Sequence, residues 1–234
     1  MEITPELSVF SVLIIGFVLG LRHATDADHL AAVSTIVSEK KNLFTSMIIG
    51  GFWGFGHTIS LFAVGIVIIL LKFQLSDLES IEPKLEAIVG GMLVLLGLNA
   101  LRKIFTAKEI HAHPHKHGDH AHTHIHLHKH ENEKWHHRFS PRSVIIGMVH
   151  GLAGSAGLML LVVPTISSPT VALFYILVFG VGSIAGMMLM SLLIGLPFHF
   201  TADKFDFLNR GIRLCAALFS LGLGFFIVYE KLLQ

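Results

Sequence analysis

The chain has 234 residues, of which 53% are hydrophobic and 14% are charged, and its mean hydropathy is +0.69. Soluble domains typically carry about 25% charged residues, so this composition excludes an ordinary soluble protein and predicts an integral membrane protein. The formal net charge of +1 and the lack of a basic stripe with interleaved aromatic residues argue against nucleic-acid binding. The single cysteine excludes an intrachain disulfide and a cysteine-based zinc cluster.

Six apolar stretches are long enough to cross a bilayer, which takes about 20 helical residues. They lie at 9–33, 43–71, 85–106, 142–164, 170–196 and 208–229. Charged residues interrupt the first, which is the weakest by hydropathy. The strand-like alternation of a transmembrane barrel is absent from these stretches. We therefore expect an all-α integral membrane protein with six transmembrane helices.

Lysine and arginine gather in alternate loops, which predicts orientation because such residues favour the cytoplasmic side. The basic loops follow the first, third and fifth stretches, with Lys40 and Lys41, then Arg102 to Arg142, then Lys204 to Arg213. The acidic N-terminus and the loop at 72–84 fall on the other side. We expect a plasma-membrane protein with both termini outside and the long central loop in the cytoplasm.

The first stretch contains the unusual segment Arg22-His23-Ala24-Thr25-Asp26-Ala27-Asp28-His29-Leu30. Polar side chains are costly inside a membrane and mark transport paths or pairs, and histidine with aspartate is a ligand set for divalent transition metals. The competing interpretation is a helix end at the cytoplasmic interface, but further apolar residues follow before Glu39. We treat the segment as a candidate metal site.

Spacing limits how this segment can bind an ion. His23, Asp26 and His29 follow one another at steps of three residues and trace a slanted arc on a straight helix, with Asp28 almost opposite Asp26. The two aspartates cannot then ligate one ion together. Either the helix is broken, or one aspartate orients a histidine or pairs with Arg22. We predict a break at Ala24–Asp28 that brings His23 and His29 to one ion.

Two further histidines lie in the middle of apolar stretches. His57 follows a glycine-rich run in the second stretch, and His150 lies within the fourth. A buried neutral histidine bonded to a backbone carbonyl is the ordinary alternative. Because polar groups in lipid usually face a functional interior, we predict that His57 completes the metal site and that His150 contributes to it.

An internal repeat relates two of the stretches. Residues 12–21 align with 143–152 at a constant offset, and six of the last eight positions are identical. Three spans in each half would place the second half in the membrane upside down, which is the inverted repeat of many secondary transporters. Chance similarity of two glycine-rich helices is the alternative. We expect halves at 1–106 and 141–234, joined by a loop at 107–140.

That loop is rich in histidine. Residues 111–137 hold twelve of the seventeen histidines in the chain, many at every second position. Such a tract cannot form a core and is expected to be disordered without ligand, and its composition is typical of nickel, cobalt, zinc or copper binding. We predict a cytoplasmic metal buffer or sensor.

The charged segment resembles the signature of the nickel/cobalt permease family, H-x-x-x-x-D-H within R-H-A-x-D-A-D-H, with His23, Asp28 and His29 at its defining places. Gly56-His57-Thr58 is similar to that family's second motif. The sequence around His150 resembles the urease-accessory membrane proteins of the same superfamily, and the histidine-rich loop resembles its exporters. Family permeases usually have eight spans, whereas six are expected here.

The resemblance implies a non-enzymatic permease for Ni²⁺ or Co²⁺ with no prosthetic group, His23, Asp26, Asp28, His29, His57 and His150 being the candidate site. Uptake is favoured over efflux, and no nucleotide-binding motif is present. An intramembrane metalloenzyme would be the alternative class, but the segment lacks H-E-x-x-H. A metal sensor or accessory subunit is a further alternative. Expected partners are the metal ion and the bilayer, with a homo-oligomer or urease and hydrogenase metal-delivery proteins also considered.

Overall fold

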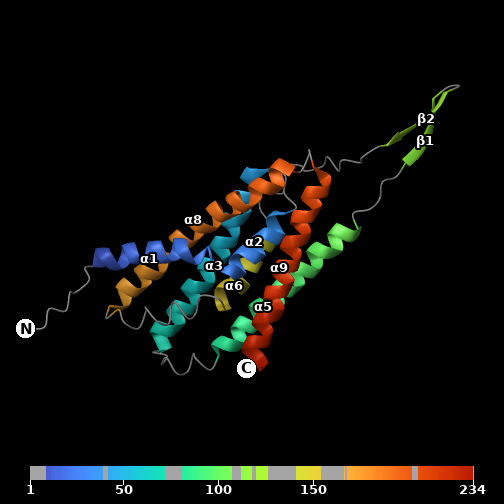
Figure 1. Ribbon diagram of the computed structural model, residues 1–234. Coiled ribbons are helices and arrows are strands. Elements are labelled where there is room, and N and C mark those ends of the chain that lie inside the picture. Colours follow the sequence, from blue (N-terminus) through green and yellow to red (C-terminus); the bar gives the residue numbers. More distant parts are fainter. Residues whose placement is uncertain are drawn as a thin grey trace, which may run out of the picture.

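The computed structural model (Figure 1) describes most of the chain as helices. The described residues are 9–38, 42–71, 81–106, 112–117, 120–125, 141–153, 166, 168–201 and 205–233. Within these ranges there are seven helices and one two-stranded hairpin. The expectation of an all-helical membrane protein is confirmed for the membrane part.

The helices follow the apolar stretches of the sequence. Their bounds are α1 Val9–His23, α2 Ala27–Val37, α3 Leu43–Leu71, α5 Glu82–Thr106, α6 Pro141–Ala153, α8 Pro169–Thr201 and α9 Asp206–Leu233. Helices α3, α5, α8 and α9 are each long and apolar enough to cross a bilayer, and the bent pair α1 and α2 would make a fifth span. The later part of the predicted fourth span, 154–164, falls outside the described residues, so a sixth span remains a prediction.

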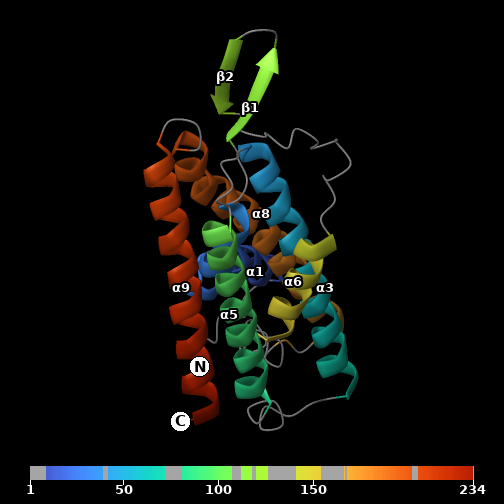
Figure 2. The same ribbon diagram turned by 90° about the vertical axis from the view of Figure 1, so that its right-hand side faces the viewer.

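Four helix pairs make most of the contacts: α5 with α9, α3 with α8, α3 with α6, and α1 with α8. Figure 2 shows α5 and α9 running side by side along one edge of the bundle. Large apolar side chains such as Phe10, Leu95 and Phe207 are more than half exposed, as a lipid-facing surface requires. The buried interior holds small residues, large apolar side chains such as Trp53, Tyr175 and Phe179, and several histidines.

Close approach of backbones fixes two of these pairs. A Cβ added to Gly20 of α1 would lie 2.1 Å from the carbonyl oxygen of Phe179 in α8, and one added to Gly147 of α6 would lie 2.0 Å from that of Trp53 in α3. Real Cβ atoms do not come so near, so only glycine allows these crossings. Small residues play this part in membrane helices because they let backbones approach.

Within the histidine-rich loop the structure describes an antiparallel hairpin of β1 (Ala112–His117) and β2 (His120–Ile125) that projects from one end of the bundle (Figures 1 and 2). For these residues the structure describes paired strands in place of the disorder expected from composition. The repeat of histidine at every second position matches the two-residue period of a strand, and His113, His115 and His117 are in register with His124, His122 and His120. The rest of the loop, including 126–137, lies outside the described residues.

Candidate metal centre

The first apolar stretch breaks where its charged residues begin. Helix α1 ends at His23 and α2 begins at Ala27, and the two axes differ by 55°. The backbone N–H of Thr25 donates to the carbonyl of Arg22 at 2.8 Å, and that of Asp26 to the carbonyl of His23 at 3.1 Å. Asp26 is the N-cap of α2, with an extended backbone conformation that aspartate favours at this position. The predicted break at Ala24–Asp28 is confirmed.

The bend turns His23 and His29 toward each other. Their ring centroids are 4.4 Å apart, and the ring of His57 from α3 lies 5.2 Å from His23 and 5.3 Å from His29. One ligand nitrogen from each of the three lies within 4.8 Å of the other two. Two nitrogens bound to one ion at about 2.1 Å each are at most about 4.2 Å apart. Three ligands of one tetrahedral ion are nearer still, about 3.4 Å apart, so the three rings would move together by up to about 1.4 Å to hold a metal ion.

Each aspartate of the segment holds a different histidine. Nδ1 of His23 is 2.7 Å from a carboxylate oxygen of Asp26, and Nδ1 of His29 is 3.0 Å from one of Asp28. A neutral imidazole that donates Nδ1–H to a carboxylate presents its other nitrogen as a lone pair. A carboxylate behind a histidine is the usual support for a metal ligand. Among the alternatives left open by spacing, the structure combines the break with two orienting carboxylates.

The Nε2 atoms of His23 and His29 are buried and have no hydrogen-bond partner in the described part of the chain. His23 is 2% exposed, and His29 and His57 are fully buried. An unpartnered polar atom in such a place is costly, and so it points to something that the atom binds. Imidazole nitrogen suits nickel, cobalt, zinc and copper, so the donor set fits a divalent transition metal.

His150 joins this site from the second half of the chain. Its Nε2 lies 2.8 Å from the second carboxylate oxygen of Asp28, and its ring is 4.2 Å from that of His29. Asp28, His29 and His150 form a second group with ligand atoms close enough for one ion. Its members already hydrogen-bond to one another, so we regard this group as support for the three-histidine cluster.

Two buried aromatic residues that were not predicted from the sequence pack against the histidines. The ring of Trp53 lies 5.3 Å from both His29 and His150, and that of Phe179 lies 5.6 Å from His23. Both are about 1% exposed. Trp53 precedes His57 by four residues and so shares its helix face. That spacing could have identified Trp53, whereas no local signal indicates Phe179.

Close contacts between α6 and α3 fix the positions of His57 and His150 relative to each other. A Cβ on Gly151 would lie 2.5 Å from the carbonyl oxygen of His57, and the hydroxyl of Ser60 donates to the carbonyl of Met148 at 2.8 Å. Glycines one turn apart, Gly147 and Gly151, thus seat α6 on Trp53 and His57. All six candidate residues predicted from the sequence come together here.

Residues 9–229 match the family NicO, described as high-affinity nickel-transport protein. The chain is 39% identical over 211 residues to a urease accessory protein, UreH, of Bacillus sp. (strain TB-90), which covers 89% of this chain and 87% of the relative. It is 25% and 23% identical to the chloroplast proteins FOR GROWTH AND FERTILITY 1 and 2 of Arabidopsis thaliana, and it spans little more than half of their length. No solved structure matches.

Proposed function

Because the chain belongs to the NicO family of high-affinity nickel-transport proteins, we propose that it is a secondary permease that carries Ni²⁺ or Co²⁺ into the cell across the plasma membrane. The observation that carries the proposal is the buried cluster of His23, His29 and His57 at a helix break, with a carboxylate behind two of the three rings. Ionisable residues inside a membrane typically serve such a path. The protein acts as a transporter and not as an enzyme.

In this proposal the transported ion binds the Nε2 atoms of His23 and His29 and a ring nitrogen of His57. Asp26 and Asp28 orient the first two histidines and balance the positive charge of the ion. His150 acts through Asp28, to which it donates a hydrogen bond. The ion is the substrate, and no prosthetic group is involved.

The membrane potential supplies the driving force. Moving a +2 ion inward across 100 mV releases about 4.6 kcal/mol, which supports roughly a thousandfold accumulation. A proton gradient would be a second source. Both act without ATP.

We further propose six spans arranged as two inverted halves, with the termini outside and the histidine-rich loop inside. The pattern of contacts supports this, because α1 of the first half packs on α8 of the second while α6 of the second packs on α3 of the first. The repeated glycines take part: Gly16 and Gly20 approach Tyr175 and Phe179, and their counterparts Gly147 and Gly151 approach Trp53 and His57. A pseudo-twofold axis between the two halves would exchange the helix pair α1–α8 with the pair α6–α3.

The histidine-rich loop is proposed to buffer metal on the cytoplasmic side. The register of β1 and β2 places three histidines of one strand opposite three of the other. Efflux is the second candidate function, since a metal-binding loop in the cytoplasm could equally deliver metal to an exporter. The urease accessory relative suggests that imported nickel is passed to metal-delivery proteins of nickel enzymes, and a homo-oligomer would be compatible with this role.

Nickel accumulation tests function and direction together. We expect cells that express the protein to hold more ⁶³Ni than cells with an empty vector, and the His23→Ala variant to lose this gain. His199→Ala, which removes an exposed histidine at the end of α8, serves as the matched control and should retain it. If expressing cells hold less nickel than empty-vector cells, the protein is an exporter. If the two hold equal amounts, the proposal of transport is overturned.

A further inference from the structure

One buried hydroxyl of α8 has no hydrogen-bond partner. Ser183 is fully buried, and its Oγ bonds to nothing in the described part of the chain. Other buried hydroxyls of the bundle do have partners: Ser60 donates to the carbonyl of Met148 at 2.8 Å, and Ser220 donates to that of Leu93 at 2.9 Å. A buried hydroxyl without a partner is energetically costly. Ser183 is therefore a candidate contact for a bound group.

The helical period directs Ser183 between α1 and α3. Successive residues of a helix turn by about 100°, so Phe179 and Gly186 lie about 40° and 60° to one side of Ser183. Gly180 and Met187 lie about 60° and 40° to its other side. The first two residues contact α1 and the turn that follows it, while the second two contact α3. The side chain of Ser183 therefore leaves α8 toward the junction of α1 with α3.

Contacts with both neighbouring helices also place Ser183 level with the histidine cluster. A Cβ on Gly20 of α1 would lie 2.9 Å from the backbone nitrogen of Ser183, and one on Gly54 of α3 would lie 2.9 Å from the Cα atom of the next residue of α8. His23 follows Gly20 by three residues, and His57 follows Gly54 by three. Residues three apart share a helix face, so both histidines lie on faces directed at this part of α8. Their ring centroids are 5.2 Å apart.

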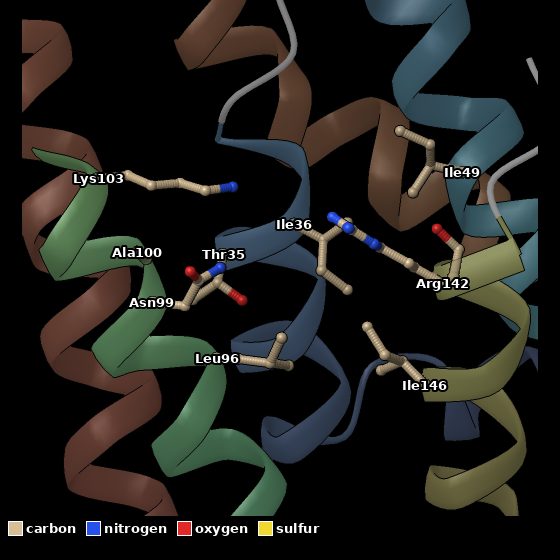
Figure 3. Close-up of a pocket in the computed structure, with 10 residues that line it drawn as sticks. Thr35, Ile36, Ile49, Leu96, Asn99, Ala100, Lys103, Arg142 and Ile146 are labelled. Carbon is tan, nitrogen blue, oxygen red and sulfur yellow. The ribbon is translucent and has the colours of Figure 1, made fainter. Parts of the chain in front are cut away.

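Water in the cavity of Figure 3 does not account for the unpartnered hydroxyl. That cavity lies between α2, α3, α5 and α6, and its lining includes Ile36, Asn99 and Arg142. None of the described residues of α8 lines it. Water held there would therefore not satisfy Ser183, which faces the histidines instead.

We propose that Oγ of Ser183 is a fourth ligand of the transported ion, beside the three histidine nitrogens of the cluster. The inference rests on the transport proposed above, because it assigns one more residue to the same ion. Sites with three protein ligands commonly complete their coordination with an oxygen atom, and a hydroxyl oxygen has lone pairs to offer. A neutral hydroxyl is a weak ligand, which suits a site that must release its ion after binding it.

Cobalt absorption tests whether residue 183 touches the ion. Co²⁺ bound to a thiolate shows a sulfur-to-cobalt charge-transfer band in the near ultraviolet, and binding itself removes the proton from the thiol. Cys215→Ala removes the only native thiol of the chain. In that background we expect Ser183→Cys to develop the band when Co²⁺ is added to the purified protein. Cobalt bound to the histidine-rich loop does not contribute, because the band requires a sulfur ligand.

Ser191→Cys in the same background is the matched control. Ser191 is also fully buried and unpartnered within the described residues, but it lies eight residues, or about 12 Å, further along α8. Its Oγ packs against Gly50, where an added Cβ would lie 2.1 Å from it. This position is directed at α3 alone, so the Ser191→Cys variant should show no band.

Alanine variants give a second measurement. We expect Ser183→Ala to weaken Co²⁺ binding by about tenfold or more and Ser191→Ala to leave it unchanged. Quenching of Trp53, whose ring lies 5.3 Å from that of His29, reports this binding in a Trp135→Phe background. If Ser183→Cys does not fold, the alanine comparison decides.

Two results would overturn the proposal, and they differ in what else they affect. If the parent protein binds Co²⁺ at the cluster but Ser183→Cys shows no band and the alanine variants bind equally, Ser183 is not a ligand and the transport proposal still stands. If the parent protein shows no Co²⁺ binding near Trp53, the histidine cluster is not a metal site and both proposals fail.

Discussion

Asp28 and His150, which lie 122 positions apart in the chain, are joined by a hydrogen bond of 2.8 Å. The other carboxylate oxygen of Asp28 is 3.0 Å from His29, so one side chain connects a candidate ligand of the first half with a histidine of the second. The Asp28 side chain is about 20% exposed while both imidazoles are fully buried. Its negative charge therefore acts close to the proposed ion and in poor contact with solvent.

Removing that charge should weaken metal binding. We expect Asp28→Asn to lower the affinity for Ni²⁺ by about 10- to 100-fold, the usual effect of losing a group that supports a metal-binding histidine. The asparagine keeps the size of the side chain but loses the negative charge and one of two acceptor oxygens. Calorimetric titration of the purified protein with nickel measures this. Asp206→Asn, at the exposed start of α9, is the control, and equal affinities in the two variants would contradict the role given to Asp28.

The two histidines of α3 and α6 should differ in their effects. His57→Ala removes a proposed ligand and is expected to cost more than about a hundredfold in nickel affinity. His150→Ala removes a partner of Asp28 and is expected to cost about 10- to 100-fold. X-ray absorption spectroscopy of the nickel complex should show one imidazole fewer in the first variant and an unchanged number in the second. The reverse order would place the ion in the group of Asp28, His29 and His150.

A methyl group at the α3–α6 crossing should disturb the site from outside it. In Gly151→Ala the new Cβ would meet the carbonyl oxygen of His57 at 2.5 Å, and such overpacking typically costs about 1–3 kcal/mol. We expect a lower melting temperature together with weaker nickel binding. Gly222→Ala in α9 adds the same methyl group where nothing lies within 4 Å. It should leave both measurements unchanged or raise the melting temperature slightly, and a similar loss in both variants would refute the explanation.

Trp53 should report on occupancy of the site. Its ring lies 5.3 Å from His29, close enough for an open-shell ion such as Ni²⁺ to quench its fluorescence. The chain has two tryptophans, so Trp135→Phe leaves Trp53 as the single tryptophan, which can be excited apart from the tyrosines. Nickel should quench this variant with saturation, and adding His23→Ala should shift the quenching to much higher nickel concentrations. Quenching that ignores the His23 change would place the bound ion elsewhere.

Much of the site could be predicted because its chemistry is local in sequence. Three polar residues at steps of three, His23, Asp26 and His29, imply a break in any helix that uses them together, and the break is present between α1 and α2. The burial of His57 follows from the cost of exposing a polar side chain to lipid in the middle of a long apolar helix. These inferences needed only the helical period and the cost of polar groups in lipid.

The partners of the aspartates could not be predicted in the same way. Asp28 reaches His150 because α6 packs closely on α3, and that distance depends on the contact of Gly151 with His57. The contact of His23 with Phe179 likewise depends on how α1 crosses α8. Such helix crossings depend on side chains from distant segments of the chain, so they cannot be predicted from the residue spacing within one segment.

The break between α1 and α2 also bears on how the protein is made. The two pieces have 15 and 11 residues, and each is shorter than the roughly 20 residues that a helix needs to cross a bilayer unaided. Helix α1 finds its main neighbour only in α8, which is synthesised much later. We therefore expect the polar turn between α1 and α2 to lack its packing partners during early membrane insertion. The histidine cluster should be among the last parts of the protein to assemble.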